Sequence, residues 1–259
     1  MARKPPCRSF ARISRKRRAF VDRVAAIFHS TISGNVAPSA SGLGITGAGG
    51  IRAFDGASIT QSTISGNSAD GNVGGVDLYA LNGATNTIME STISGNSATS
   101  TSGLGTSGNT SIMNSTIAFN VETGSNNLGA VHIYSDHAGI HSTIIANNTS
   151  AHGQAQNIGP DVSASLGGVH NLIGPSPSET LPVGTIGGDP QLFALRYNGG
   201  PTKTHALRLG SPAVDAGSNP GGYSTDQHGT GYSRVIGPFV DIGAFEGVDA
   251  DSIFYNGFD

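Results

Sequence analysis

The sequence contains no tryptophan, a single cysteine and few charged residues, which make up 12% of its 259 residues. Helical and doubly wound proteins carry far more Leu, Glu and Lys, so this composition argues against both classes. The lone Cys7 rules out an intramolecular disulfide, and stability therefore has to come from packing. Because no apolar run reaches the roughly 18 residues that a spanning helix needs, we expect no transmembrane helix.

A conventional signal peptide is also missing, because no apolar stretch of about 7–15 residues follows the basic N-terminal residues. Nine of the 14 Lys and Arg residues lie before position 24. The rest of the chain holds 5 basic residues (14−9) and 16 acidic ones (17 less Asp22), a balance of −11. We therefore expect no nucleic acid partner for this acidic body, because cationic side chains supply most of the affinity for phosphate.

In place of charge, the chain has 39 glycines and a repeated hexapeptide, Ser-Thr-Ile-Ser-Gly-Asn. Three copies span Ser30–Asn35, Ser62–Asn67 and Ser91–Asn96, and two decayed copies follow at Ser115–Asn120 and Ser142–Asn147. Successive copies start 32, 29, 24 and 27 residues apart (62−30, 91−62, 115−91, 142−115), which is the spacing of solenoid coils. Stacked coils would align the terminal amides, which predicts a hydrogen-bonded ladder of Asn35, Asn67, Asn96, Asn120 and Asn147.

The short strands between the turns alternate inward and outward residues. This alternation places the first residue of each coil inside, at Ile51, Val76, Leu104 and Val131. It also predicts an internal column of Ile32, Ile64, Ile93, Ile117 and Ile144. The fold class is therefore all-β, a right-handed parallel β-helix of about four to six coils with a C-terminal capping domain. We expect a basic arm (1–23), coils (24–174), a linker (175–188), a cap (189–246) and a tail (247–259).

The N-terminal segment has three interpretations. Phe20, Val24, Ile27 and Phe28 fall on one stripe of a short amphipathic helix, which would close the open end of the β-helix. Alternatively, the start is artefactual or truncated, with further coils and a signal peptide upstream. A third interpretation is an arm that binds nucleic acid or membrane.

The C-terminal part carries several further motifs in a fixed order. They are His170-Asn-Leu-Ile-Gly174, Asp189-Pro-Gln-Leu, Asn198-Gly-Gly-Pro-Thr-Lys-Thr-His-Ala-Leu207, Gly210-Ser-Pro-Ala-Val-Asp-Ala-Gly217, Thr225-Asp-Gln-His-Gly229 and Val240-Asp-Ile-Gly-Ala-Phe-Glu246. This block, 157–246, resembles the choice-of-anchor Q domain found at the end of right-handed β-helix proteins on bacterial surfaces. The upstream repeats are similar to those of polymorphic outer-membrane proteins. His228 stands where that family usually has Arg, so we expect a local ion pair to be absent.

The resemblance implies an exported bacterial protein, located outside the cell or at its surface in association with the outer membrane, and it implies no defined enzymatic activity. The ending Ile253-Phe-Tyr-Asn-Gly-Phe-Asp259 resembles a short tail of other exported proteins, which would make it a sorting signal. The alternative is a terminal strand or a frayed end.

Many β-helix proteins are polysaccharide lyases or glycoside hydrolases, but the residues that those reactions need are scarce here. A lyase needs a cationic base or charge neutraliser, and Arg52 is the only Lys or Arg between residues 24 and 195. A hydrolase needs two carboxylates roughly 5–10 Å apart, and the acids of the coils occupy different repeat positions. We therefore expect no catalytic residue, metal or cofactor. A carbohydrate-active enzyme with an unusual site and a truncated gene fragment are the alternatives.

The histidines give no catalytic pattern either. His29 and His141 fall in one repeat column with Gln61, Glu90 and Asn114, which we interpret as a solvated polar edge. His152 and His228 each precede a glycine, and we interpret them as surface or turn residues.

The strands that open the coils suggest a binding face. Their outward residues form a partial aromatic stripe flanked by polar groups: Arg52, Phe54, Asp77, Tyr79, His132 and Tyr134. Such a stripe suits a sugar face or a protein partner, and its alternative role is to stabilise the sheet by stacking. The sequence thus predicts a non-catalytic, monomeric, adhesin- or passenger-like surface protein that binds a glycan or a protein.

Overall fold

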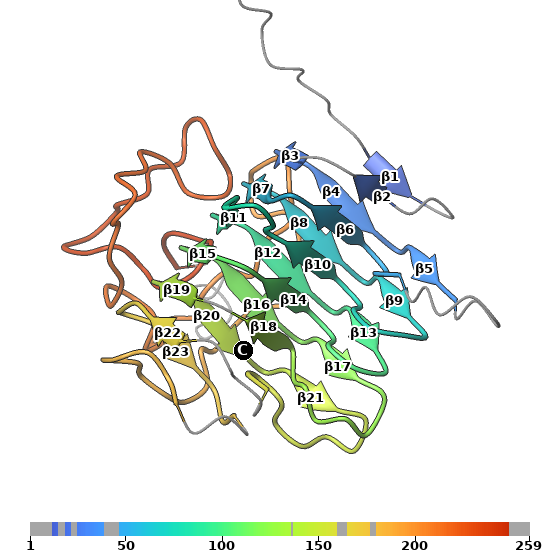
Figure 1. The fold of residues 1–259 in the computed structure, drawn as a ribbon. Coiled ribbons are helices and arrows are strands. Elements are labelled where there is room, and N and C mark those ends of the chain that lie inside the picture. Colours follow the sequence, from blue (N-terminus) through green and yellow to red (C-terminus); the bar gives the residue numbers. More distant parts are fainter. Residues whose placement is uncertain are drawn as a thin grey trace, which may run out of the picture.

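The computed structural model describes residues 12–14, 19–21, 25–38, 47–135, 137–159, 165–176 and 180–248. This part of the chain contains 23 strands and no helix, and therefore no helix that could cross a membrane. The strands form four parallel sheets of 7, 5, 6 and 5 strands, which run side by side along a β-solenoid of about five turns (Figure 1). The predicted fold class, an all-β parallel β-helix, is confirmed.

Each turn of the solenoid adds one strand to each sheet, so every strand pairs with its equivalents in the adjacent turns. The sheet that contains the hexapeptide, here the repeat sheet, consists of β1 (Arg12–Ser14), β4 (Thr31–Ser33), β8 (Thr63–Ser65), β12 (Thr92–Ser94), β16 (Thr116–Ala118), β20 (Ile144–Ala146) and β23 (Leu172–Ile173). The sheet that opens each coil, here the opening sheet, consists of β2 (Ala19–Val21), β6 (Ile51–Phe54), β10 (Val76–Tyr79), β14 (Leu104–Ser107) and β18 (Val131–Ser135).

The two remaining sheets connect these faces. The middle sheet consists of β3 (Ala25–Phe28), β7 (Ala57–Thr60), β11 (Asn86–Met89), β15 (Thr110–Met113), β19 (His137–His141) and β22 (Ser165–Gly167). The short sheet consists of β5 (Val36–Ala37), β9 (Ser68–Ala69), β13 (Ser97–Ala98), β17 (Val121–Glu122) and β21 (Thr149–Ser150).

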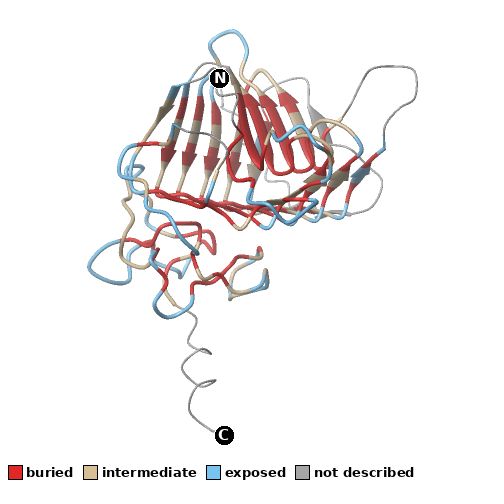
Figure 2. Cartoon of the chain, turned by 90° about the horizontal axis from the view of Figure 1, so that it is seen from below, coloured by how far each residue is buried: buried red, intermediate tan, exposed pale blue. Residues whose placement is uncertain are grey.

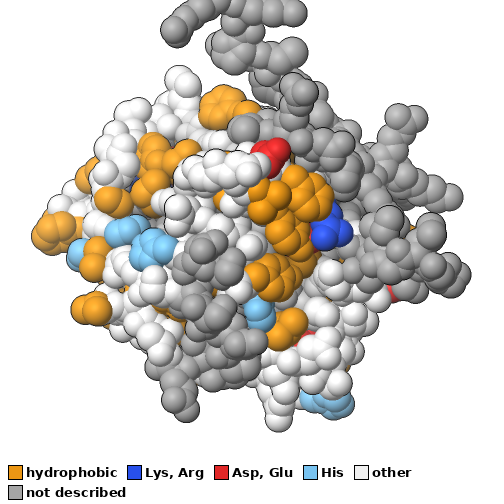
Figure 3. All heavy atoms as spheres, in the orientation of Figure 1, with side chains coloured by type: hydrophobic (Ala, Val, Ile, Leu, Met, Phe, Trp, Pro, Cys, Tyr) orange, Lys and Arg blue, Asp and Glu red, His pale blue; other side chains and the backbone are white. Residues whose placement is uncertain are grey.

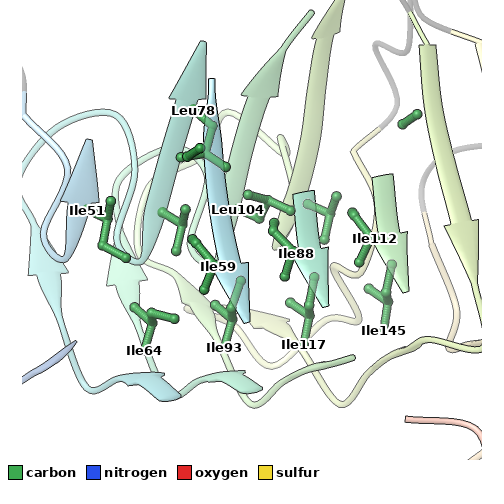
Figure 4. Packing of buried hydrophobic residues seen from close by; sticks show 14 of the residues in the cluster. Ile51, Ile59, Ile64, Leu78, Ile88, Ile93, Leu104, Ile112, Ile117 and Ile145 are labelled. Carbon is green, nitrogen blue, oxygen red and sulfur yellow. The ribbon is translucent and has the colours of Figure 1, made fainter. Parts of the chain in front are cut away.

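Branched aliphatic side chains from three sheets fill the solenoid (Figure 4). The residues that open each coil, including Ile51 and Leu104, are fully buried, as the alternation predicted. Isoleucines of the repeat sheet lie in one row along the axis: Ile32, Ile64, Ile93, Ile117 and Ile145. Because each coil packs only on its neighbours, this row makes the core continuous from turn to turn.

A ladder of buried asparagines runs along one corner of the solenoid. The Nδ2 of each amide donates to the Oδ1 of the next over 2.9 Å, and that Oδ1 also accepts the backbone N–H of the preceding asparagine. The ladder comprises Asn35, Asn67, Asn96, Asn120, Asn148 and Asn157. The predicted asparagine ladder is therefore present, with a different residue at its fifth position.

The prediction of Asn147 as the fifth ladder residue is wrong. Strand β18 contains a β-bulge, because Thr106 pairs with Ile133 whereas Ser107 pairs with Ser135, so that Tyr134 is an extra residue. Everything after this bulge is displaced by one position relative to the repeat. Asn147 occupies the position of the hexapeptide glycine, where its φ is 58°.

The same bulge explains why two other predictions are wrong. Ile145, not Ile144, continues the internal isoleucine row, because it pairs with Ile117. Ser142, not His141, continues the polar column, because His141 pairs with Met113 in the middle sheet. Ser142 shares the positive φ of the other column members, 44° to 48° at His29, Gln61, Glu90 and Asn114, with 45° of its own.

The predicted short N-terminal helix is also wrong. Residues 19–21 form β2, and Ala25–Phe28 form β3, which pairs in register with Ala57–Thr60. Ile27 packs against the core whereas Phe28 is 54% exposed, so the apolar pattern follows the two-residue period of a strand. An open sheet edge offers a complete row of backbone hydrogen bonds, which an isolated short helix does not provide. Most of the predicted arm lies outside the described residues.

The C-terminal loops, residues 186–248, pack across the outer face of the repeat sheet, and we call them the cap (Figure 2). Toward its C-terminal end this face is apolar, and Ile144, Ala146 and Leu172 form a second core with Leu207 and Ile242. Nearer the N-terminal end the contacts are polar. The Thr63 hydroxyl donates to the carbonyl of Lys203 (2.6 Å), and the Thr92 hydroxyl donates to Oε1 of Gln227 (2.6 Å).

Replacement of Asn148 with Ala tests the corrected register. The change removes the acceptor of two buried donors of Asn120, at 2.9 Å each, and should lower the free energy of unfolding by about 3 kcal/mol. Asn147→Gly is the control, because glycine favours the positive φ of that site, and it should change stability by less than about 1 kcal/mol. Urea unfolding measures both variants, and a larger loss from Asn147→Gly would contradict the register.

Candidate functional site

The structure brings all six predicted binding residues together on the outer face of the opening sheet. Arg52 and Phe54 lie on β6, Asp77 and Tyr79 on β10, and His132 and Tyr134 on β18. Parallel register places Arg52 beside Asp77 and Phe54 beside Tyr79. Hydrophobic side chains gather over these strands, with basic atoms at the edge of the group (Figure 3). We call these six residues the aromatic face.

Arg52 is held from three sides within the aromatic face. Its Nε lies 3.2 Å from the Asp77 carboxylate, and its Nη2 donates to the Tyr79 hydroxyl at 3.4 Å. The guanidinium carbon also lies 5.4 Å from the ring centroids of both Phe54 and Tyr79, within the range of cation–π attraction. This framework fixes a cation whose side chain is 18% exposed beside two partly exposed rings.

The aromatic rings stack along the solenoid axis. Phe54 and Tyr79 are 5.0 Å apart between centroids and 16° from parallel, and Tyr79 and Tyr134 are 6.4 Å apart and 4° from parallel. Tyr134 reaches back across β14, where a β-carbon on Gly105 would lie 2.8 Å from its hydroxyl oxygen. The bulge and this glycine together allow a continuous stack over three turns. The rings of the stripe therefore stack on one another, as its alternative role of stabilising the sheet requires.

Burial raises the pKa of Asp77 to about 6, although the neighbouring Arg52 favours the charged form. Burial also raises the pKa of Tyr134, and burial together with Asp77 raises that of Tyr79. His132 is buried, and its ring lies 4.7 Å from that of Tyr134. The face therefore combines fixed hydrogen-bonding groups with aromatic surface, which is the chemistry of recognition.

The sequence suggested that the polar column at the corner between the middle and repeat sheets is a solvated edge. This interpretation is wrong, because most of the column is buried. Gln61, Glu90 and Asn114 are buried beneath the C-terminal loops. Gln61 donates to the Asp226 carbonyl at 2.8 Å, and Asn114 donates to the Ser218 carbonyl at 3.0 Å. The column therefore serves as the docking edge for residues more than 100 positions later in the chain.

Arg234 joins this edge to the cap through charge. It is fully buried, with Nη2 3.2 Å from Glu246 and Nη1 3.8 Å from Glu90. Its two terminal nitrogens also donate to the carbonyls of Gly243 and Asp241, at 3.0 and 2.6 Å. Sequence reasoning missed this cluster, because Glu90 and Arg234 belong to different motifs and nothing local indicates their proximity.

Two carboxyls share the single Arg234 in a buried setting. Burial raises the pKa of Glu90 to about 8 and that of Glu246 to about 7, and Arg234 opposes both shifts. Buried groups of this kind hold protons more tightly in the folded state than in the unfolded chain.

His228 lies in a turn, as the sequence suggested, but it is buried and not at the surface. Its Nδ1 lies 2.9 Å from Asp226, and its Nε2 lies 3.2 Å from the Thr204 hydroxyl. The expected loss of a local ion pair is thus offset by a histidine–carboxylate contact. The three groups resemble a catalytic triad, but a β-carbon on Gly200 would lie 2.6 Å from the His228 ring, so the backbone closes over them.

Comparisons with protein-family models, with curated proteins and with solved structures return no match. The resemblance to the choice-of-anchor Q domain therefore depends on the sequence motifs alone. Within the described residues, no three His, Cys, Asp or Glu side chains gather as a metal site would require.

The buried carboxyls predict a pH-dependent stability. Because the folded-state pKa of Glu90 is raised from 4.5 to about 8, the free energy of unfolding should fall as the pH rises between these values. Glu90→Gln removes the titrating carboxyl. It should make the slope of the free energy of unfolding against pH less steep, by up to about 1 kcal/mol per pH unit.

Urea unfolding at several pH values measures this slope, and Asp70→Asn, at an exposed carboxylate, is the control. An equal slope in Glu90→Gln and in the unsubstituted protein would contradict the raised pKa.

Proposed function

We propose that this protein is a non-catalytic binding module of an exported bacterial surface protein, and that the aromatic face contacts a glycan or a protein partner. The observation that carries the proposal is the convergence of Arg52, Phe54, Tyr79 and Tyr134 into one ordered, partly exposed group. Rings fixed by stacking and a guanidinium fixed by Asp77 lose little conformational entropy when a ligand binds.

The rest of the solenoid supports this choice of face. The cap covers much of the outer face of the repeat sheet, and the asparagine ladder is buried, so neither presents a comparable surface. The solenoid keeps the aromatic face flat and rigid over three turns, which suits an elongated ligand.

A binding role agrees better with the aromatic face than hydrolysis does. Hydrolysis needs two carboxyls on opposite sides of the scissile bond, and Asp77 is the only carboxyl of the aromatic face. Asp77 is also fully buried and paired with Arg52, which leaves it poorly placed to donate or accept a proton at a substrate.

The proposed export is based on the motifs that resemble the choice-of-anchor Q domain and on the repeats that are similar to those of polymorphic outer-membrane proteins. The family resemblance adds no activity of its own.

Affinity electrophoresis through gels that contain neutral or acidic polysaccharides tests the binding role. Tyr79→Ala and Tyr134→Ala should weaken retardation about tenfold, because each removes a ring of the stack. Phe239→Ala is the matched control, because this ring is 63% exposed and lies on the cap. Circular dichroism establishes that each variant remains folded.

The same polymers should carry no new chain ends after incubation. New chain ends would overturn the proposal in favour of a carbohydrate-active enzyme. Retardation that is unchanged in both tyrosine variants would place the binding surface elsewhere.

A further inference from the structure

The basic residues of the acidic body are unevenly placed. After residue 24 the chain has only Arg52, Arg196, Lys203, Arg208 and Arg234. Arg52 belongs to the aromatic face, and Arg234 is fully buried. The remaining three lie within 13 residues of one another, in the first part of the cap.

These three cations lie on two segments, 192–197 and 203–208, which isolated antiparallel bridges join and which we call the ribbon. Leu192 pairs with Leu207, and Arg196 pairs with Thr204, in antiparallel bridges. The backbone N–H of Phe193 donates to Ala206 at 2.9 Å, and Arg196 and Thr204 exchange backbone hydrogen bonds at 3.0 and 3.2 Å. Leu192 and Leu207 point into the second core, whereas Arg196 and Arg208 are exposed.

Aromatic rings hold these cations on the outer side of the ribbon. The guanidinium carbons of Arg208 and Arg196 lie 4.2 and 5.5 Å from the ring centroid of Phe193. The Lys203 ammonium lies 5.4 Å from the ring centroid of Tyr197, which is 62% exposed.

The ribbon is rigid because its inner side is fixed to the solenoid. Nδ1 of His205 donates to the Phe193 carbonyl at 2.7 Å, so Nε2 of the neutral ring accepts from the Ser94 hydroxyl at 2.8 Å. Asn198 accepts from Nε of Arg196 at 2.9 Å and donates to Thr204, which orients the guanidinium. The cations are thus positioned before any ligand arrives.

Charge complementarity identifies the ligand class. Among the described residues, no carboxylate lies within ion-pair distance of Arg208 or Lys203, although the body carries a charge of −11. Guanidinium groups pair with carboxylates through two parallel hydrogen bonds, and an exposed tyrosine ring suits the apolar face of a sugar. The acidic remainder of the body would repel duplex DNA, with one charge per about 1.7 Å, more strongly than a polysaccharide with one charge per sugar.

We propose that the outer side of this ribbon, formed by Phe193, Arg196, Tyr197, Lys203 and Arg208, binds an anionic polysaccharide with carboxylates on successive sugars. Arg208, beside Phe193, pairs with one carboxylate of the polymer, and Lys203, beside Tyr197, pairs with another. This site is separate from the aromatic face and does not depend on the function proposed for it.

Affinity electrophoresis with two matched polymers tests the site. Polygalacturonate carries one carboxylate per sugar, and its fully methyl-esterified form has the same backbone without charge. To weaken attraction by the nine N-terminal cations, all proteins carry Gln in place of Arg15, Lys16, Arg17 and Arg18. Polygalacturonate should retard this protein, and Lys203→Gln with Arg208→Gln should weaken the retardation about tenfold. Retardation of the protein by the esterified polymer should not change with these substitutions.

Phe239→Ala is the control, because this exposed ring belongs neither to the ribbon nor to the aromatic face, and it should leave polygalacturonate binding unchanged. Equal retardation of the double variant and its parent would overturn the proposal. Sedimentation with anionic phospholipid vesicles, without retardation by polygalacturonate, would overturn it in favour of a membrane surface.

Discussion

The amide ladder is the interaction on which the arrangement of coils depends. Each internal amide accepts two hydrogen bonds at Oδ1 and donates from Nδ2 to the next amide, and most also donate to an isoleucine carbonyl of an adjacent coil. A coil that slipped by one residue would leave these buried groups unpaired, at about 1–3 kcal/mol each. The corner therefore fixes the register of all four sheets, and the hydrophobic core fills the space that remains.

The ladder also determines what can lie opposite it. Gly50, Gly75 and Gly103 precede the opening strands, and a β-carbon on any of them would lie 3.1–3.2 Å from an amide nitrogen of the ladder. Backbone carbonyls of the next coil would be closer still, at 2.4–2.8 Å. The glycine pairs of the sequence thus follow from the close packing of backbone around the amide corner.

The sequence was sufficient for the coil and for the aromatic face, because both depend on short-range periodicity. Alternation along β6, β10 and β18 assigned each side chain to a face, and parallel stacking then brought equivalent positions together. It was insufficient at the bulge, because the stretch from Ser142 to Asn148 matches the repeat in two registers. The signal was Asn147, because asparagine, like glycine, tolerates a positive φ.

Contacts between distant segments could not be predicted in this way. The Glu90–Arg234 pair spans 144 residues (234−90), and no repeat or motif relates the two positions. The N-terminal strands were missed for a related reason. A four-residue apolar pattern fits a helix or a strand equally well, and only the open edge of the neighbouring coil decides between them.

The cap contacts successive coils of the solenoid, from Thr63 in one coil to Leu172 four coils later. Polar contacts join the cap to the early coils, and apolar contacts join it to the late ones. The length of the cap therefore has to match the number of coils between these contacts. Open solenoids can gain or lose a repeat by duplication or deletion with little penalty. Here a duplicated coil would move Thr63 and Glu90 away from Gln227 and Arg234, and the length of the cap therefore limits how many coils evolution can insert.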